Sequence, residues 1–303
     1  MCCSSGRRTW KECVTSRVDL LVVLHNSRPL IPSLIDSLRT ISIPVTAYFL
    51  DNDSNDGTPE ALDAAIGQLP FPAYLLRSLR NNGFARGMNL LAAQGQAEFI
   101  FLLNPDTRLA AGCLEKLVER ADSDPRIAIC EARQSPREHP KAFDAATGET
   151  TWCSGAAALI RREAFHEIGG FDERLYFMYC EDVDLSWKFW LRGWKCIYLP
   201  TAVVQHFTQD LTPGKRRTIE NYFSFRNSIF LFYRFGSWKD RKILWNFLFK
   251  RFASRAYSVQ SKILFAFALV DHIRYIPYLY QTRDRWSDSH HPWVRLSETS
   301  LSH

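Results

Sequence analysis

The sequence predicts an α/β fold, in which a mostly parallel, Rossmann-like sheet is flanked by helices and followed by a C-terminal helical appendage. Continuous apolar runs such as residues 18–25 and 98–104 are typical of strands buried on both faces. Segments with helical spacing of apolar residues alternate with these runs, as expected when crossover helices join parallel strands. The 303 residues, 46% of them hydrophobic, are enough for one large domain and an appendage.

Each element has its own signal along the chain. Thr58 and Pro59 mark a helix start, whereas residues 134–152 lack periodicity and are predicted as a loop. The predicted strands are residues 18–25, 45–51, 73–78, 98–104, 127–132, 155–160, 195–199 and 202–206. The predicted helices are residues 30–38, 58–68, 84–94, 111–121, 163–168, 182–191, 218–235 and 239–280, the last two amphipathic and rich in aromatic side chains.

Composition and charge divide the chain into three segments. Residues 1–17 form a loose polar arm, residues 18–210 an α/β domain, and residues 211–303 a helical, basic, aromatic-rich region. From residue 207 onward there are 16 Lys and Arg against 7 Asp and Glu, whereas the whole chain carries a net charge of only +6. This basic tail is either a solvated helical face or a surface for anionic lipid headgroups or a phosphate-bearing substrate.

The eight cysteines are irregularly spaced and include no C-x-x-C pair, so neither a zinc ribbon nor a thioredoxin-like redox site is indicated. No apolar signal-peptide core is present at the N-terminus, so we expect the thiols to be reduced and mostly buried. Only their position near the N-terminus makes Cys2 and Cys3 candidates for lipidation. The longest apolar run, residues 263–270, is shorter than the roughly 18 residues that span a bilayer.

Polar clusters follow the predicted strands, at the sheet edge where parallel sheets bind ligands. Residues 51–58 hold three carboxylates and two amides, which suit either an acidic turn that caps the next helix or a pocket for a nucleoside. Residues 81–89 place Gly83, Arg86 and Gly87 at the start of a helix. That segment is either a plain Gly/Asn loop or a pyrophosphate site, because helix N-termini attract anions.

Two further candidates also stand at strand ends. Asn104, Pro105 and Asp106 follow directly on an apolar strand. A carboxylate buried there is costly unless it binds a partner, and Mg²⁺ and Mn²⁺ prefer such oxygen ligands; the alternative is a turn Asp that caps the next helix. His206 ends the last predicted strand, a place where a single His is more often structural than a ligand.

Glu181 and Asp182 begin a predicted helix between two aromatic runs. Carboxylates in aromatic surroundings are candidates for general-base catalysis. The alternative is that they only offset the positive end of the helix dipole.

Together these segments resemble glycosyltransferase family 2, which has the GT-A fold, and in particular its bacterial rhamnosyltransferase-like branch. The family pattern Asp-Asn-x-Ser-x-Asp-Gly-Thr stands at residues 51–58, Asn-x-Gly-Phe at 81–84, and the metal motif, here Asn-Pro-Asp, at 104–106. Gly-Gly-Phe-Asp-Glu follows at 169–173 and Glu-Asp-x-Asp-Leu at 181–185, so the match runs in family order from residue 18 to 206.

The resemblance implies a role for each candidate. Asp51 would contact the nucleobase, and Asp182 would be the catalytic base. Asp106 and His206 would bind Mg²⁺ or Mn²⁺ at the donor diphosphate. Asn104 replaces the usual first Asp of the metal motif, and its neutral amide weakens the case for a direct metal ligand there. The other expected residues are Asp53, Asn82, Gly83, Arg86, Asn104 and Arg226 for the donor, and Trp152, Gly155 and Glu181 for the acceptor.

The implied reaction is inverting, metal-dependent transfer of a single sugar from a nucleoside-diphosphate sugar to the hydroxyl of a saccharide or lipid-linked saccharide. The branch favours dTDP-rhamnose as the donor. We expect this reaction in cell-surface polysaccharide synthesis, in the cytoplasm or on the inner face of the cytoplasmic membrane. Peripheral contact with anionic lipid fits the basic tail, and no nucleic-acid partner is expected.

Three alternatives fit the sequence less well. A processive polysaccharide synthase would carry membrane spans and Gln-x-x-Arg-Trp, whereas residues 281–286 read Gln-Thr-Arg-Asp-Arg-Trp. A dinucleotide-dependent oxidoreductase would carry G-x-G-x-x-G after the first strand, where residues 25–29 read His-Asn-Ser-Arg-Pro. A catalytically silent nucleotide-sugar-binding scaffold is disfavoured because Asp106, Asp182 and His206 are all retained.

Overall fold

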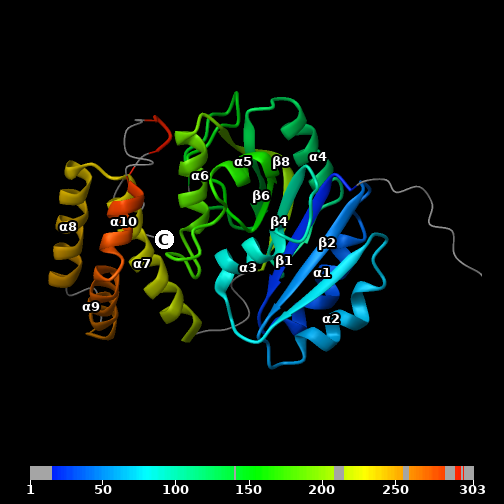
Figure 1. Cartoon of the computed structure of the whole chain (residues 1–303), viewed down its shortest axis with the longest axis horizontal. Helices are drawn as coiled ribbons and strands as arrows, with labels where there is room; N and C mark the ends of the chain where they lie inside the picture. The colour runs from blue at the N-terminus through cyan, green and yellow to red at the C-terminus, as the bar shows by residue number, and fades with distance from the viewer. Residues whose placement is uncertain are drawn as a thin grey trace, which may run out of the picture.

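An eight-stranded sheet organises the α/β part of the molecule, in the strand order β3-β2-β1-β4-β7-β6-β8-β5 (Figure 1). The computed structural model describes residues 16–139, 141–207, 215–254, 259–283, 291–294 and 296. The strands are β1 (Val18–Leu24), β2 (Val45–Asn52), β3 (Ala73–Ser78), β4 (Phe99–Leu103), β5 (Thr107–Leu109), β6 (Ile127–Ser135), β7 (Ala157–Arg161) and β8 (Lys195–His206). The helices are η1 (Arg28–Leu30), α1 (Ile31–Leu38), α2 (Thr58–Ile66), α3 (Gly83–Ala92), α4 (Cys113–Asp122), α5 (Arg162–Glu167), α6 (Glu181–Leu191), α7 (Lys215–Phe235), α8 (Trp238–Ala253), α9 (Val259–Ile273) and α10 (Ile276–Arg283).

The prediction of a mostly parallel sheet is confirmed. The neighbouring pairs β1–β2, β1–β4, β2–β3 and β6–β8 are parallel, whereas β4–β7, β6–β7 and β5–β8 are antiparallel. Strand β7 therefore runs against its neighbours in the middle of the sheet. Every residue of β4 is buried, because helices cover both faces of the sheet.

Two predicted strand assignments are wrong. Residues 195–199 and 202–206 belong to the single strand β8, which stays paired with β6 across an irregularity after the Ala132–Leu199 pair. Strand β5 was not predicted, because three residues are too few for a period to be recognised. It forms by pairing with the end of β8.

Two predicted boundaries also moved. The expected helix over residues 239–280 is divided among α8, α9 and α10, although helical spacing of apolar residues continues through most of the range. Strand β6 extends through Ser135 into the expected loop, because β8 continues alongside it.

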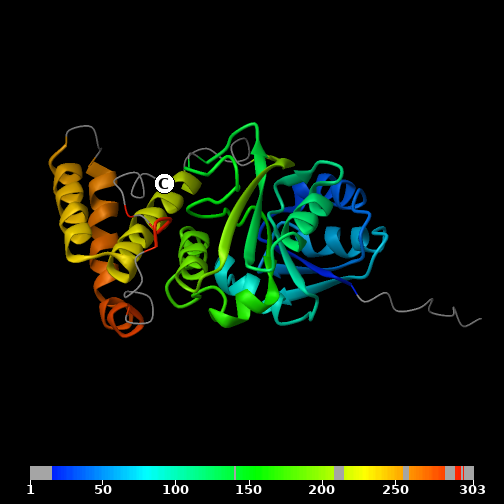
Figure 2. The same cartoon turned by 90° about the horizontal axis from the view of Figure 1, so that it is seen from above.

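Helices lie on both sides of the sheet (Figure 2). On one face, Leu34 of α1, Leu62 of α2 and Leu117 of α4 share a core with the strands. On the other face, Met88 of α3 and Trp187 of α6 belong to a second core. This layering leaves the loops at the strand ends free of covering helices, which is where the candidate site residues lie.

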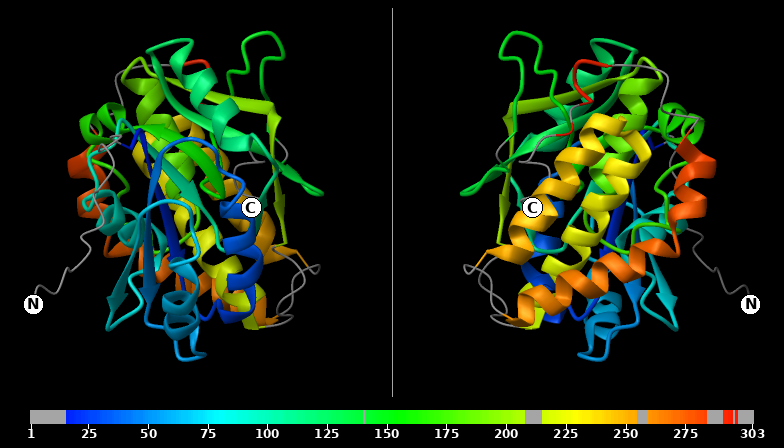
Figure 3. Two further views of the ribbon diagram at one scale, coloured as in Figure 1. Left: turned by 90° about the vertical axis from the view of Figure 1, so that its right-hand side faces the viewer. Right: turned by 90° about the vertical axis from the view of Figure 1, so that its left-hand side faces the viewer.

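Helix α7 belongs to two cores. Phe230 lies in the core on the second face of the sheet, whereas Phe232 lies in a third core with Leu244 of α8 and Phe265 of α9. Helices α8, α9 and α10 form the end of the molecule away from α2 (Figure 1), and the right-hand view of Figure 3 looks onto them. Helices α8 and α9 are therefore joined to the sheet through α7, whereas Leu279 of α10 lies in the core on the second face itself.

Polar contacts also fasten α7 to the segment that leads into α6. Asn227 Nδ2 donates to the carbonyl oxygens of Met178 and Tyr179, at 2.8 and 2.7 Å. Arg234 is 1% exposed and reaches Asp184 of α6 and Asp172, at 2.7 and 2.6 Å. The expected boundary between residues 210 and 211 stays a prediction, because residues 208–214 lie outside the described part.

The five cysteines within the described ranges are unpaired and buried, as predicted: Cys113, Cys130, Cys153, Cys180 and Cys196. The N-terminal arm up to residue 15, with Cys2 and Cys3, lies outside the described residues. Among the described helices, none alone is long and apolar enough to cross a membrane. One pair bent by 58°, Lys262–Ile273 with Ile276–Arg283, passes the same test of length and composition.

Candidate active site

Asp51 stands at the edge where the parallel strands β1, β2 and β4 end together. The register pairs it with Leu24, the last residue of β1. Its side chain is buried, with the residue 4% exposed. Oδ2 accepts a hydrogen bond from Ser54 N at 3.4 Å, but Oδ1 has no hydrogen-bond partner. A buried carboxylate oxygen without a donor is costly, so this atom is suited to an N–H or O–H group of a ligand.

Asn52, which was not among the predicted site residues, holds the loop at Asn81 and Asn82 in place. Its Nδ2 donates to Asn81 Oδ1 at 3.0 Å, and its Oδ1 accepts from Asn82 N at 2.8 Å. The Asn82 amide also donates to Ser78 Oγ at 2.7 Å. The side chain of Asn82, expected to contact the donor, is thus used inside the protein to shape the loop.

Gly83 allows close packing of the start of α3 on the segment before α6. Its φ is +75°, and a Cβ there would lie 2.2 Å from Phe177 O. The next residue, Phe84, donates its N–H to the same oxygen at 2.7 Å. The contact that requires glycine is therefore made by protein rather than by ligand. Arg86 is partly exposed, with its Nε 4.0 Å from Glu173 Oε1.

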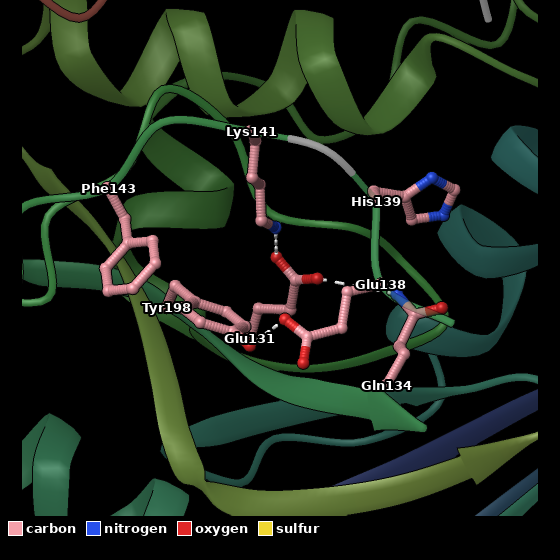
Figure 4. Close-up of a pocket in the computed structure, with 7 residues that line it drawn as sticks. All are labelled: Glu131, Gln134, Glu138, His139, Lys141, Phe143 and Tyr198. Atoms are coloured by element: carbon pink, nitrogen blue, oxygen red, sulfur yellow. Dashed lines mark hydrogen bonds and ion pairs between the residues drawn. The ribbon is translucent and has the colours of Figure 1, made fainter. Parts of the chain in front are cut away.

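Asp106 and His206 face each other because β5 pairs with the end of β8, placing Thr107 opposite His206. The His206 Nε2 atom lies 3.3 Å from Asp106 Oδ1, and both side chains are 8% exposed. His206 Nδ1 lies 2.6 Å from Gln134 Oε1. The Gln134 amide nitrogen points the other way, toward Glu131 Oε1 at 3.4 Å (Figure 4). Gln134 thus accepts the Nδ1–H of His206.

With Nδ1–H donated to Gln134, His206 Nε2 faces the Asp106 carboxylate, as an ion-pair donor when the imidazole is protonated and with its lone pair when it is neutral. In the neutral form two acceptors stand 3.3 Å apart in a buried place, which is unfavourable unless a cation binds to both. An imidazole nitrogen and a carboxylate oxygen suit a divalent cation such as Mn²⁺. No group of three or more His, Cys, Asp and Glu arranged for a metal occurs in the described residues.

Asn104 is held by its main chain. Its N–H donates to Ala156 O at 2.9 Å, and its carbonyl accepts from Thr107 N at 3.2 Å. A direct contact of its side chain with metal or donor stays a prediction. Beside Asp106 lies a cavity of about 260 Å³, lined by Pro29, Leu30, Ser33, Pro105, Asp106, Thr107 and Phe207.

Asp182 is held at the start of α6 by two main-chain donors. Gly155 N donates to its Oδ2 at 3.2 Å, and Val183 N lies 2.9 Å from its Oδ1. Because Ala156, next to Gly155, binds Asn104, one short segment joins the Asp182 side of the site to the Asp106 side. Residues 155–156 therefore connect the expected metal motif at residues 104–106 with the expected base Asp182.

Glu181, the neighbour of Asp182, is buried and its Oε2 has no hydrogen-bond partner. Burial, and then the charge of Asp182, raises the pKa of Glu181 well above its usual value. Two adjacent carboxyl groups in different surroundings can divide the roles of proton acceptor and proton donor.

Trp152 contacts Lys141, one of the residues that line a small polar cavity. Lys141 donates to Trp152 O at 3.2 Å and places its ammonium 4.8 Å from the ring centre of Trp152. Figure 4 shows Lys141 paired with Glu131 in this cavity. Burial lowers the pKa of Lys141 to about 8. The cavity measures about 30 Å³, which holds one water rather than a sugar ring.

Arg226, expected at the donor, is buried in α7. Its Nη1 lies 2.9 Å from Asp271, its Nη2 donates to Leu175 O at 3.0 Å, and its Nε donates to Asn227 at 3.0 Å. All three nitrogens are used within the protein, so Arg226 links α7 to α9 and to the segment before α6. A role in donor binding stays a prediction.

Comparison with known families identifies the chain. The family model described as "Glycosyl transferase family group 2" matches residues 99–280, and the model described as "Glycosyl transferase family 2" matches residues 19–169. The chain belongs to glycosyltransferase family 2. The predicted rhamnosyltransferase-like character is also confirmed by the relatives of this family 2 protein.

Two relatives are rhamnosyltransferases. The N-acetylglucosaminyl-diphospho-decaprenol L-rhamnosyltransferase of Mycobacterium tuberculosis is 30% identical over 240 residues, covering 64% of this chain and 76% of the relative. The O-antigen chain rhamnosyltransferase RfbN of Salmonella typhimurium is 26% identical over 233 residues, covering 68% of this chain and 70% of the relative.

Solved structures confirm the GT-A fold of this family 2 chain. The mannosyltransferase PcManGT from Pyrobaculum calidifontis, in complex with GDP-Man and Mn²⁺, has a TM-score of 0.57 at 17% identity, covering 98% of this chain and 84% of that one. The structure of S. aureus TarS has a TM-score of 0.58 at 17% identity, covering 89% of this chain and 53% of that one.

Proposed function

We propose that this family 2 glycosyltransferase is inverting and metal-dependent, and that it transfers a single sugar from a nucleoside-diphosphate sugar to the hydroxyl of a saccharide or lipid-linked saccharide. The rhamnosyltransferase relatives favour dTDP-rhamnose as the donor and cell-surface polysaccharide synthesis as the setting. The relative named for a diphospho-decaprenol substrate supports a lipid-linked acceptor.

The observation that carries the proposal is the facing pair of Asp106 Oδ1 and His206 Nε2, 3.3 Å apart and buried. Mg²⁺ and Mn²⁺ are commonly held by one or two protein ligands together with substrate phosphates. Asp106 and His206 would hold the ion beside the cavity that Asp106 lines. A bound divalent ion would supply positive charge to offset the diphosphate leaving group. Asp51 Oδ1, buried without a partner, would receive an N–H or hydroxyl of the nucleoside.

Asp182 is the proposed base. The N–H groups of Gly155 and Val183 hold its carboxylate in one orientation, from which it would take the proton of the acceptor hydroxyl as that oxygen attacks the anomeric carbon. Attack from the side opposite the leaving diphosphate inverts the anomeric configuration. Glu181, whose pKa is raised well above its usual value by burial and by the charge of Asp182, would in its protonated form donate a hydrogen bond to the acceptor, with Trp152 at the rim of the acceptor site.

Donor binding measured by calorimetry tests the metal part of the proposal. We expect one donor from a panel of dTDP-, UDP- and GDP-sugars to bind with Mn²⁺ or Mg²⁺ and to be released by EDTA. Asp106→Asn should weaken this binding by about tenfold or more, because even changes to residues behind metal ligands have effects of that size. The control is Asp36→Asn, which neutralises an exposed carboxylate of α1 and should bind like wild type.

Product analysis tests the catalytic part. Transfer to a saccharide acceptor should be abolished in Asp182→Asn while donor binding is kept, and NMR of the product should show the inverted anomeric configuration. Donor binding that is unchanged by EDTA would refute the metal dependence. A product with retained anomeric configuration would refute the inversion. Donor binding without transfer by wild type would favour the silent scaffold.

A further inference from the structure

Exposed apolar side chains are concentrated on the last three helices. Sixteen large hydrophobic residues are exposed in the described part of the chain, and ten of them lie on α8, α9 and α10. These ten are Trp238, Ile243, Trp245, Phe249, Val259, Ile263, Phe267, Val270, Ile273 and Tyr280. Patches of this kind on a folded protein mark a surface that contacts a partner or a membrane.

On α9 the exposed apolar residues follow the helical period. Val259, Ile263, Phe267 and Val270 are separated by four, four and three positions, so they form one stripe, and Phe267 is 64% exposed. The side of α9 that carries Phe265 instead packs in the core with α7 and α8. Helix α9 is therefore apolar on both its buried and its exposed side.

Helix α8 repeats this arrangement with basic residues added. Trp238, Trp245 and Phe249 are separated by seven and four positions and are exposed by 67%, 49% and 75%. Lys242 Nζ lies 5.8 Å from the ring centre of Trp238, so aromatic and basic groups share this face. Another side of α8, which carries Leu244 and Leu248, packs into the third core.

Charge distinguishes between the possible occupants of this surface. Residues 238–283 contain nine Lys and Arg against two Asp and Glu, a net charge of +7, whereas the whole chain carries +6. A second copy of the same face would bring two such positive surfaces together. Anionic lipid headgroups complement the charge, and tryptophan and lysine side chains on amphipathic helices suit the boundary between headgroups and acyl chains.

We propose that α8 and α9 form a docking surface for an anionic lipid bilayer, with Trp238, Trp245, Phe249, Ile263 and Phe267 inserted at the headgroup boundary. Figure 3 shows these helices at one end of the molecule. Helix α7 packs on the buried sides of α8 and α9 and is hydrogen-bonded to the segment before α6. Docking would therefore hold α6, which carries Asp182, at a fixed place relative to the membrane. The docking itself does not depend on the proposed reaction.

Vesicle flotation of the full chain tests the proposal. Wild type should float with phosphatidylcholine vesicles that contain phosphatidylglycerol, and much less with pure phosphatidylcholine. The double variant Phe249→Glu/Phe267→Glu should bind the anionic vesicles at least about tenfold more weakly, since it replaces two apolar contacts with charge. Leu79→Glu is the matched control, because Leu79 is 99% exposed and follows β3, the edge strand of the sheet, outside the terminal helices.

Several results would overturn the proposal. Equal flotation of the double variant and wild type, or equal binding to neutral and anionic vesicles, would exclude this surface or its lipid preference. A lipid-free dimer that the double variant abolishes would assign the face to a second copy. Resistance of bound wild type to carbonate extraction would indicate embedded helices instead. Circular dichroism of the double variant should match wild type, and transfer to a water-soluble acceptor should be kept, which separates docking from catalysis.

Discussion

A single amide, Gln134, decides which nitrogen of His206 faces Asp106. Its Oε1 lies 2.6 Å from His206 Nδ1, and its orientation is in turn set by Glu131. Residues that orient a metal-binding imidazole strongly affect metal affinity, although they do not touch the metal. Changing such a residue typically lowers the affinity by about tenfold to a hundredfold. Gln134 is thus a positioning residue for the proposed metal site, although it would not touch the ion.

The variant Gln134→Met should weaken Mn²⁺-dependent donor binding by about tenfold to a hundredfold, because the imidazole loses the acceptor that fixes its tautomer. Calorimetry measures the affinity, and nitrogen NMR of the imidazole should show the wild-type tautomer lost. Arg133→Met, which changes the partly exposed neighbour, is the control and should bind normally. Unchanged affinity in Gln134→Met would show that Asp106 alone determines the metal site.

Glu181 makes folding stability depend on pH. Its pKa is raised well above 4.5 in the folded protein, first by burial and then by the charge of Asp182. The folded state therefore keeps a proton that the unfolded chain releases, and stability falls as the pH rises above about 4.5. In Glu181→Gln this loss should be smaller, which urea unfolding between pH 4.5 and 8 would measure. Equal pH slopes in variant and wild type would contradict a neutral Glu181.

The sequence could predict Asp51, Asp106 and Asp182 because each carboxylate interrupts an apolar or aromatic pattern. It could not predict Gln134, whose partner His206 is 72 positions away and meets it only through the pairing of β6 with β8. Asn82 and Arg226 carry the family's residue types, but their polar groups are used within the protein. Which polar atoms stay free depends on tertiary packing that a motif does not record.

Helix α7 is the element through which α8 and α9 are attached to the α/β part. Arg234 forms ion pairs with Asp184 and Asp172, and all three side chains are almost fully buried. Burial alone would raise the pKa of Asp184, but Arg234 and Lys188 hold it below its usual value. The negative charge of Asp184 on α6 is thus partly balanced by the positive charge of Arg234 on α7.

Arg234→Met should destabilise the protein by about 3–5 kcal/mol, because it leaves buried Asp172 without its cation and buried Asp184 with Lys188 alone. Urea unfolding would measure the loss, and transfer activity should fall as well, since α6 carries Asp182. Lys239→Met on the exposed side of α8 is the control, with an expected change within about 0.5 kcal/mol. A variant as stable as wild type would mean that the ion pairs of Arg234 do not contribute to holding α7 in place.

Helices and strands could be predicted from the sequence where their own residues show a clear apolar pattern. Buried strands such as β1 and β4 are continuous apolar runs, and the sequence shows them directly. Strand β5 has three residues and exists only because β8 passes beside it. Strand β8 appeared as two strands because Pro200 and Thr201 interrupt its apolar pattern, yet β6 continues to pair with it on both sides.

The molecule has two distinct functional surfaces, the proposed catalytic edge of the sheet and the proposed docking surface on α8 and α9. The sheet edge carries the carboxylates and the histidine, whereas the far helices carry exposed aromatic and basic side chains. The sequence indicated this division through its basic tail. The exposed stripes required the structure, because only the packing of α7, α8 and α9 in one core shows which side of each helix is left open.

The position of β8 in the sheet has a consequence for synthesis on the ribosome. Strands β1 to β4, β6 and β7 are complete once residue 161 has emerged, but β6 then has an open edge until β8 is made. His206, the last residue of β8, meets Asp106 across 100 positions. The nascent chain thus exposes an unpaired strand for some 45 residues of elongation, a few seconds at usual rates. We expect chaperones to be needed during this interval.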